Sequence, residues 1–355
     1  MSKVILITGG CGFVGSNVAV LLKKKYPGYT IIALDNLKRS GSELNLPRLK
    51  KHEVRFVHGD IRNREDFDDI GHIDLLIEAS AEPSVLSGIN SSLDYLINTN
   101  LNGTINCLNF ANKNKAGFIF LSTSRIYPIK QIESIAFRES ATRFEILPGQ
   151  PLPGITSLGI SEKFSLEGSR SFYGATKLTS ELLIQEYNAF LGMPTVINRC
   201  GVITGPYQMG KIDQGVAVLW VARHFWKRNL SDIGYGGEGK QVRDILHVDD
   251  LFNLLDEQIH NVGKYSGKTF NVGGGIESSI SLKELTSLCE DVTGNKIDIV
   301  KDLEPRPADI RIFISDNSLI NTLSGWSPVK KPLEIVSDIY RWIENDQKVL
   351  SGILN

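Results

Sequence analysis

The sequence predicts an α/β fold, a doubly wound parallel sheet with a smaller α/β region towards the C-terminus. Two observations predict it. Short runs that are apolar throughout, rather than alternating, recur along the first two-thirds of the 355 residues. Longer helical patterns separate these runs, which is typical of a parallel sheet that helices cover on both faces.

The expected elements follow in an order that suits this fold. Strands are expected at residues 3–8, 30–35, 54–60, 74–80, 117–123 and 194–200. Helices are expected at residues 15–26, 94–114 and 173–192. Residues 130–170 show neither pattern, and so long a loop in a compact domain is usually functional or mobile. We therefore expect residues 1–200, with later strands near 235–275, to form the doubly wound domain, and residues 201–355 to form mainly the smaller region.

Composition narrows the class of protein. The net charge of −1, with 22% charged residues, predicts neither a nucleic acid nor a membrane surface as a partner. The sequence has no apolar run of about 18 residues, and residues 1–10 lead into a strand pattern without a long apolar run and cleavage site, so we expect neither a membrane span nor a signal peptide. The four cysteines are far apart and form no C-x-x-C pair, which predicts reduced thiols, a cytoplasmic location and no metal site.

A glycine-rich turn, "ITGGCGFVGSN", joins the first expected strand to the first helix. Gly10, Gly12 and Gly15 fit G-x-G-x-x-G, and Gly9, Gly12 and Gly15 fit the related G-x-x-G-x-x-G spacing. Such a turn lets the backbone approach a pyrophosphate, which the helix N-terminus then binds. Asp35 ends the second strand 20 residues after Gly15, where a carboxylate binds the ribose hydroxyls of NAD and repels a 2′-phosphate. The sequence thus predicts a Rossmann domain that binds NAD, although Arg39 keeps NADP open.

A tyrosine and a lysine lie four residues apart in "FYGATKL", at the start of the helix expected at 173–192. This spacing puts Tyr173 and Lys177 on one helix face. An ammonium lowers the pKa of a phenol from its usual value of about 10, so Tyr173 could act as a base near neutral pH. Thr123 ends the strand at 117–123, on the cofactor side of a parallel sheet, and could hydrogen-bond the same substrate oxygen. The alternative is that Ser122 and Thr123 merely cap the strand.

These residues resemble the extended short-chain dehydrogenase/reductase family over nearly the whole chain. The motifs "TGGCGFVG", "DNL", "GDI", "NLNGT", "LSTSRIY", "YGATK", "VRDILHVDD" and "FNVGG" occur in the family's order. The resemblance implies that Thr123, Tyr173 and Lys177 are the catalytic hydroxyl, base and lysine. The cofactor-binding residues that it implies, together with the glycine loop and Asp35, are Gly9, Gly12, Phe13, Val14, Gly15, Asp35, Asn36, Arg39, Ser40, Asp60, Ile61, Ala79, Ala81, Asn100, Ser122, Tyr173 and Lys177. Asp60 would reach the adenine, or it could simply cap a helix.

The family's substrates are mostly nucleotide-activated sugars. The resemblance implies that Arg243 pairs with the substrate diphosphate, and that Arg306 and Asp309 belong to a second nucleotide-binding segment. Each arginine could instead form a surface salt bridge. The helices starting near residues 90 and 173 would pair into a four-helix interface between two copies, or simply pack on the sheet.

Four longer segments are similar to the CDP-tyvelose (CDP-paratose) 2-epimerases, a subfamily that uses CDP-hexoses. They are "DNLKRSGSELNLPRL", "FVHGDIRN", "YQMGKIDQGVAVLWVAR" and "GEGKQVRDILHVDDL". The "DQG" triplet, residues 213–215, is the most specific, and Gln214 is the candidate for the nucleotide pocket. The chain departs from the subfamily at Ser124 to Pro128, and at Phe172, where the subfamily usually has proline.

The residues after Thr123 indicate the type of reaction. Related 4,6-dehydratases need an acid and a base there, typically Asp-Glu, whereas this chain has Ser124 and Arg125. The sequence therefore disfavours dehydration and favours epimerisation, through transient oxidation to a ketone and reduction on the other face. Three alternatives stay open: a UDP-sugar 4-epimerase, a net sugar-nucleotide reductase or decarboxylase, and a non-catalytic NAD-binding sensor.

Overall fold

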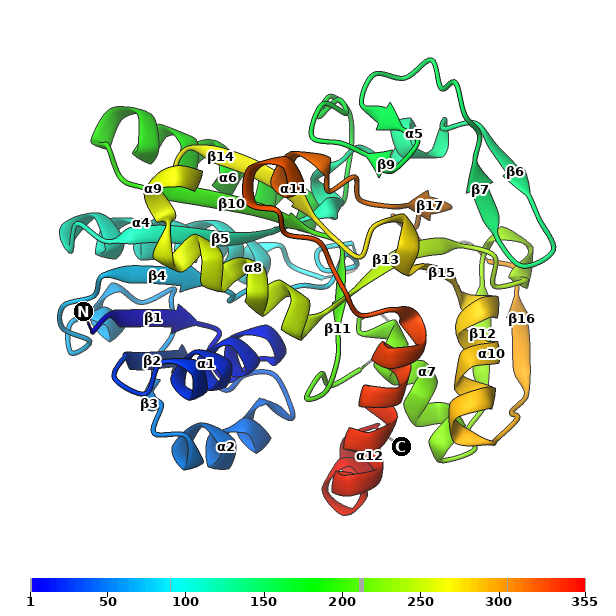
Figure 1. Cartoon of the computed structure of the whole chain (residues 1–355), viewed down its shortest axis with the longest axis horizontal. Helices are drawn as coiled ribbons and strands as arrows, with labels where there is room; N and C mark the ends of the chain where they lie inside the picture. Colours follow the sequence, from blue (N-terminus) through cyan, green and yellow to red (C-terminus); the bar gives the residue numbers. More distant parts are fainter. Residues whose placement is uncertain (1, 90, 211–213, 305, 355) are drawn as a thin grey trace. The chain divides into compact units, whose positions relative to one another are not determined.

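The computed structural model describes the chain except for residues 1, 90, 211–213, 305 and 355. The chain divides into two compact units, and each is assembled from three segments (Figure 1). The first unit comprises Met1–Thr123, Phe172–Arg199 and Phe252–Phe270. The second unit comprises Ser124–Ser171, Cys200–Leu251 and Asn271–Asn355.

A seven-stranded sheet in the order β14-β10-β5-β4-β1-β2-β3 underlies the first unit and confirms the predicted fold class. Neighbouring strands pair in parallel from β5 to β3, for example with Glu78 of β4 opposite Phe120 of β5. The strands are β1 (Val4–Thr8), β2 (Thr30–Asp35), β3 (Arg55–His58), β4 (Leu75–Glu78), β5 (Gly117–Thr123), β10 (Thr195–Cys200) and β14 (Lys268–Val272).

Helices form where the sequence predicts them, with one interruption. The predicted helix at 94–114 contains a π-helical stretch at Asn98–Asn102, and such stretches are frequent at functional sites. Because π-helical turns have no sequence periodicity of their own, the pattern could not predict this one. The helices of the first unit are α1 (Phe13–Lys25), α2 (Leu46–Lys51), α3 (Asp94–Ile97), α4 (Gly103–Lys113), α6 (Phe172–Leu191), α9 (Val262–Tyr265) and most of α8 (Val248–His260).

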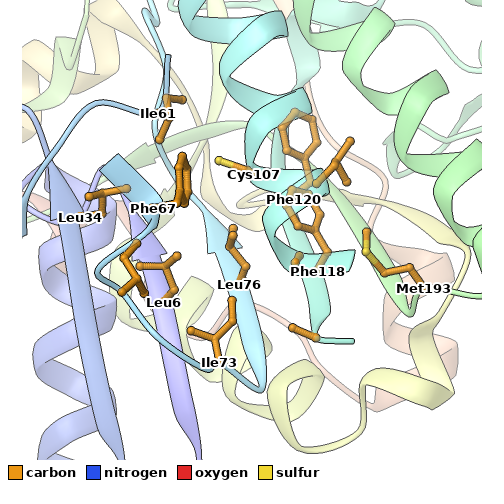
Figure 2. Close-up of a cluster of buried hydrophobic side chains, with 14 of the residues drawn as sticks. Leu6, Leu34, Ile61, Phe67, Ile73, Leu76, Cys107, Phe118, Phe120 and Met193 are labelled. Atoms are coloured by element: carbon orange, nitrogen blue, oxygen red, sulfur yellow. The ribbon is translucent and has the colours of Figure 1, made fainter. Parts of the chain in front are cut away.

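The apolar strand residues form the core of this unit. Figure 2 shows Leu6, Leu76, Phe118 and Phe120 from the sheet packed with Cys107 of α4. Each of these side chains is fully buried. Burial of apolar area, at roughly 25 cal/mol per Å², holds the helices on the sheet and fixes the strand ends, where polar residues follow.

The second unit is built on smaller sheets. Strand β13 (Val242–His247) pairs with β11 (Val202–Thr204), β15 (Ser279–Ser281) and β17 (Ile312–Phe313). Strands β12 (Leu230–Ile233) and β16 (Ile299–Asp302) form a separate pair. Its helices after residue 200, apart from the start of α8, are α7 (Val216–Phe225), α10 (Leu282–Thr293), α11 (Ser318–Ser324) and α12 (Pro332–Leu354).

Residues 130–170 contain more regular structure than the sequence pattern indicates. They include α5 (Ile129–Glu133) and two antiparallel pairs, β6 (Phe137–Glu139) with β7 (Phe144–Ile146), and β8 (Ile155–Thr156) with β9 (Gly159–Ile160). Strands of two or three residues are too short for an alternating pattern to show. Part of this segment lines a mainly apolar cavity of about 490 Å³.

Two further findings concern the class of protein. Within the described part of the chain, no helix combines the length and the apolar character that crossing a membrane requires. All four cysteines are buried, and none of them forms a disulfide.

Candidate active site

The glycine loop has the close packing that its spacing predicts. Gly9 has a φ of +65°, and a Cβ at Gly15 would lie 2.2 Å from the Gly9 carbonyl oxygen. The Gly12 amide donates to that same oxygen at 3.0 Å. Helix α1 begins at Phe13 and continues with Val14, and its N-cap residue, Gly12, offers no side-chain hydrogen bond to the helix N-terminus. Since the first amides of a helix lack partners within it, this turn can bind an anion.

Asp35 is held directly against this loop. Its carboxylate accepts hydrogen bonds from the amides of Cys11 (2.9 Å) and Leu37 (2.8 Å). Burial raises the pKa of Asp35, while these amides act in the opposite direction. The Asn45 side chain also donates to the Cys11 carbonyl at 2.9 Å. The motif did not predict Asn45, whose contact links two segments that are far apart in the sequence.

Asp60 lies in a polar cluster near the end of β3. Its carboxylate accepts from Asn36 at 2.9 Å and forms an ion pair with Arg62 at 2.6 Å. Burial acts to raise the pKa of Asp60, but the Arg62 and Asn36 hydrogen bonds outweigh it and lower the pKa to about 2. Tyr95 lies beneath both Lys38 and Arg62, at 3.6 and 5.0 Å from its ring centroid. The sequence indicated Asn36 and Asp60, but not the two cations, Lys38 and Arg62, that lie over Tyr95.

The other predicted cofactor residues lie on loops beside the strand ends. Arg39 and Ser40 follow β2, and the Arg39 carbonyl accepts from the amide of Ser42. Ala79 and Ala81 follow β4, and the backbone there approaches Gly9 so closely that a Cβ at Gly9 would lie 2.8 Å from the Ser80 Cα. Ile61 is buried and packs against Gly103 of α4.

The three predicted catalytic residues all belong to the first unit. Thr123 is the last residue of β5, and Tyr173 and Lys177 lie one turn apart at the start of α6. All three are at least nine-tenths buried, and only 2% of Lys177 is exposed. The Lys177 Nζ lies 3.7 Å from the centroid of the Phe120 ring, over β5.

A buried ion pair joins β10 to α6, and β5 adds a hydrogen bond to it. The Ser122 hydroxyl donates to Glu181 at 2.5 Å, and Arg199 of β10 contacts the same carboxylate at 2.8 Å. Tyr173, Lys177 and Glu181 follow one another at four-residue spacing on one face of α6. The sequence analysis missed Glu181 and Arg199, although this spacing in α6 was a usable signal for Glu181.

Asn100 lies in the π-helical stretch and is 1% exposed. Its side-chain oxygen accepts from the Glu82 amide at 2.7 Å, and its side-chain nitrogen donates to the Glu82 carbonyl at 3.0 Å. That nitrogen also lies 3.4 Å from the hydroxyl of Thr176 on α6. Asn100 thus holds the segment after β4 against the helix that carries Tyr173.

In the second unit, the structure brings together two of the predicted nucleotide-binding residues. Arg243 of β13 forms an ion pair with Asp309 at 2.8 Å, and about a fifth of each side chain is exposed (16% and 21%). Arg243 also donates to the Ile310 carbonyl at 2.6 Å. Arg306 begins the turn that the Asp309 amide closes with a 3.2 Å hydrogen bond.

Gln214 lies just before α7, apart in the sequence from that cluster. Its neighbour Gly215 has a φ of +73°, a backbone conformation that favours glycine. Asp213, the first residue of the "DQG" triplet, lies outside the described residues.

The residues after Thr123 are engaged in structural contacts of the second unit. Arg125 donates to the Ala308 carbonyl at 3.2 Å, on the turn between Arg306 and Asp309. Tyr127 is buried and donates to the Asn271 side chain at 2.8 Å. Ser124 and Arg125 directly follow Thr123, and neither is a carboxylate, so the Asp-Glu pair of the dehydratases is missing at this strand end.

A second cation reinforces the same segment, and the sequence analysis missed it. The amide and the guanidinium of Arg311 both contact Glu133 of α5. The guanidinium also lies over the rings of Phe137 and Tyr235, at 4.3 and 5.2 Å from their centroids. Burial and the neighbouring Glu133 raise the pKa of Tyr235. The signal was "ADIR", in which Arg311 follows Asp309 closely.

Comparison with known proteins places this site in a family. A model of the NAD dependent epimerase/dehydratase family matches residues 5–273. The chain belongs to this family. It is 32% identical to the CDP-paratose 2-epimerase of Salmonella typhi, over 95% of this chain and 98% of that protein. It is also 29% identical to a dTDP-glucose 4,6-dehydratase of Streptomyces niveus, over 91% and 88% of the two chains.

Solved structures show the same fold. The UDP-glucose 4-epimerase of Bifidobacterium longum, solved with NAD+ and UDP, matches with a TM-score of 0.79. The match covers 97% of this chain and 99% of that one, at 22% identity. The resemblance inferred from the motifs is therefore confirmed, and the family's description bears out the predicted cofactor, NAD.

The residues of the first unit fit this cofactor. A Cβ at Gly9 or at Gly15 would lie within 3 Å of the protein's own backbone atoms, so both positions require glycine for the tight turn and close helix packing of a dinucleotide-binding loop. Asp35 ends β2 with its carboxylate fixed against the same loop. Gly12, Phe13 and Asp35 would hold the adenosine diphosphate part of NAD. Tyr173 and Lys177 would face its nicotinamide part.

Proposed function

We propose that this protein is an NAD-dependent nucleotide-sugar epimerase of the CDP-paratose 2-epimerase type. One observation carries the choice of epimerisation within the family. The chain retains the hydroxyl, base and lysine of Thr123, Tyr173 and Lys177, yet has no acid–base pair after Thr123. Elimination of water requires extra proton transfers, whereas epimerisation requires the removal and return of one hydroxyl proton and one hydride.

Each residue then has a defined role. Tyr173, as the phenolate, takes the proton of the sugar hydroxyl and later returns it. Lys177 lies one helical turn from Tyr173 and would supply an ammonium, which favours a phenolate. Thr123 donates a hydrogen bond to the carbonyl oxygen that forms. NAD, when bound, supplies the hydride acceptor and donor, so the reaction needs no external reductant.

The contacts of Arg125 support the same choice. Its guanidinium carries a permanent charge and cannot transfer protons near neutral pH. It donates to the Ala308 carbonyl, between Arg306 and Asp309. The side chain that follows the catalytic strand therefore serves the nucleotide-binding segment in this chain.

For the substrate, we propose a CDP-hexose. Arg243 and Arg306 would bind the diphosphate, and Gln214 and Asp309 would contact the nucleoside. The similarity to the Salmonella typhi enzyme along the whole chain supports cytidine and carbon 2. We place the reaction in the cytoplasm, which the four buried, unbridged cysteines support.

The test is direct. Purified protein is incubated with CDP-paratose, CDP-tyvelose, CDP-glucose and UDP-glucose without reductant, and the products are separated by chromatography. We expect interconversion of CDP-paratose and CDP-tyvelose, with no net change in nicotinamide absorbance. Conversion of UDP-glucose alone would establish the 4-epimerase alternative. A stoichiometric absorbance change would establish a net reductase or decarboxylase. Bound NAD without turnover of any sugar would favour the sensor.

We also propose that α6 forms the contact between two copies of the chain. Its outer face exposes Leu182 and Leu191 by 55% each and Phe190 by 80%. The Tyr187 hydroxyl donates to Asn109 of α4 at 2.7 Å, so these two helices form a continuous surface. An apolar patch of this kind is typical of an interface.

A further inference from the structure

A buried carboxylate, Glu78, lies at the end of β4 and has no role in the proposed reaction. It is 0% exposed. Its Oε1 accepts a hydrogen bond from the Thr104 hydroxyl at 2.7 Å. Its Oε2 has no hydrogen-bond partner among the described residues. A fully buried carboxyl group with an unsatisfied oxygen is costly, so this position requires an explanation.

The sheet register places Glu78 beside Phe120, the residue over whose ring Lys177 lies. Glu78 and Phe120 are directly paired across β4 and β5, so their side chains project from the same face. Figure 2 shows Phe120 on this face, near Cys107 of α4. The Lys177 Nζ lies 3.7 Å from the Phe120 ring centroid, over the same part of the sheet.

Among the described groups that act on Glu78, Lys177 is the one that carries an opposite charge. Burial raises the pKa of Glu78 to about 7, while the charge of Lys177 and the Thr104 hydrogen bond act to lower it. From α4, the thiol of Cys107 also faces the carboxyl group. Burial and the charge of Glu78 raise the pKa of that thiol well above its usual value, so Cys107 stays neutral.

We propose that Glu78 is a positioning residue, whose carboxylate keeps the buried Lys177 protonated and in place beside Tyr173. An ammonium that is 2% exposed would lose its proton readily without an opposite charge nearby. A neutral Lys177 could no longer favour the Tyr173 phenolate. This inference rests on the proposed function for its catalytic consequence, but the pairing itself can be tested without a substrate.

The first experiment compares kcat of the wild type and Glu78→Gln between pH 6.5 and 9. The variant keeps the shape but lacks the charge, so Lys177 should lose its proton as the pH rises. We expect the ratio of wild-type to variant kcat to increase at least about tenfold over this range, which corresponds to one pKa unit. A ratio that stays constant with pH would indicate a merely structural role and overturn the proposal.

Asp232→Asn is the matched control. Asp232 is also a carboxyl group of low exposure (9%) whose pKa burial raises, but it belongs to β12 in the second unit. We expect this variant to retain the wild-type pH profile. A changed profile in Asp232→Asn would show that loss of any buried carboxylate has this effect, and would overturn the specific role of Glu78.

The second experiment measures the free energy of unfolding against pH, with NAD but no sugar. Because the folded-state pKa of Glu78 lies above its unfolded value, Glu78 contributes stability below about pH 4.5 that is lost as the pH rises through about 7. We expect this loss in the wild type but not in Glu78→Gln. In Lys177→Met, which removes the ammonium, the loss should move to higher pH.

The two experiments separate the two proposals. A wild-type enzyme that converts no nucleotide sugar would refute the proposed function, while the unfolding data would still decide the pairing. The same pH dependence in the wild type, Glu78→Gln and Lys177→Met would refute the pairing whatever the activity.

Discussion

The two units use charged side chains in different ways. In the first unit, Glu181 and Arg199 form an ion pair whose side chains are 1% and 6% exposed, and Ser122 completes it. In the second unit, the ion pair of Arg243 and Asp309 is 16% and 21% exposed. The buried pair can only fix the shape of the site. The partly exposed pair can rearrange, because Arg243 can exchange the Asp309 carboxylate for a phosphate of a ligand.

The largest effect is expected where this fixed scaffold holds the base. Tyr173→Phe keeps the ring but removes the hydroxyl that we propose exchanges the substrate proton. We expect kcat to fall by about 10²–10⁴-fold, the usual contribution of a general acid–base group. NAD affinity, measured by fluorescence titration, should change less than about threefold, since the glycine loop and Asp35 are untouched. Retention of full activity would show that another group is the base.

Breaking the buried ion pair of Glu181 and Arg199 should affect the stability of the protein more than its activity. Glu181→Gln leaves Arg199 charged and buried without its partner, and breaking such a pair costs about 3–5 kcal/mol. We expect urea unfolding to show a loss of this size. The control is Arg138→Met, because Arg138 pairs with Glu145 but its side chain is 69% exposed. Its loss should stay below about 1 kcal/mol. Equal losses in both variants would contradict the comparison between buried and open pairs.

The contrast between the two units also explains what the sequence could predict. The first unit depends on fixed spacings, such as the glycine loop and the four-residue step from Tyr173 to Lys177. The alternation of apolar runs and helical patterns predicted the fold, and those spacings indicated the family. Glu78 and Arg199 were missed because a single charged residue in an apolar strand forms no recognisable sequence pattern. The partner of such a residue lies on another strand or helix, which only the structure identifies.

The second unit was harder to predict for a physical reason. Its short strands carry little periodicity, and its polar contacts join segments that are far apart in the sequence, such as Arg311 with Glu133. Family motifs identified Arg243 and Asp309 as members of two separate segments. The structure adds that they contact each other, and that Arg125 reaches the same turn.

A moderate effect is expected when the partly exposed pair of Arg243 and Asp309 is broken. Arg243→Met removes the cation proposed to bind the diphosphate, and a charged hydrogen bond contributes about 1.5–3 kcal/mol. KM for the nucleotide sugar should therefore rise about 10- to 150-fold, with kcat within about threefold. The control is Arg143→Met, since Arg143 is similarly exposed (24%) but binds Ser279 and Glu284 beside the apolar cavity. A fall in kcat with unchanged KM would place Arg243 in the chemical step instead.

The smallest effect is expected for Arg125, whose side chain contacts the turn between Arg306 and Asp309. Arg125→Met removes its hydrogen bond to the Ala308 carbonyl, and one such bond contributes about 0.5–1.5 kcal/mol. KM should rise about 2- to 10-fold, and Arg125→Lys should restore part of the loss because lysine can still donate to the carbonyl. Neither variant should release water from the sugar, as mass spectrometry of the products would show. A product that has lost water would mean that dehydration needs no carboxylate after Thr123, and would contradict the choice of epimerisation. An unchanged KM in both variants would mean that the turn at Ala308 is ordered without Arg125. The partly exposed pair of Arg243 and Asp309 would then position the nucleotide alone.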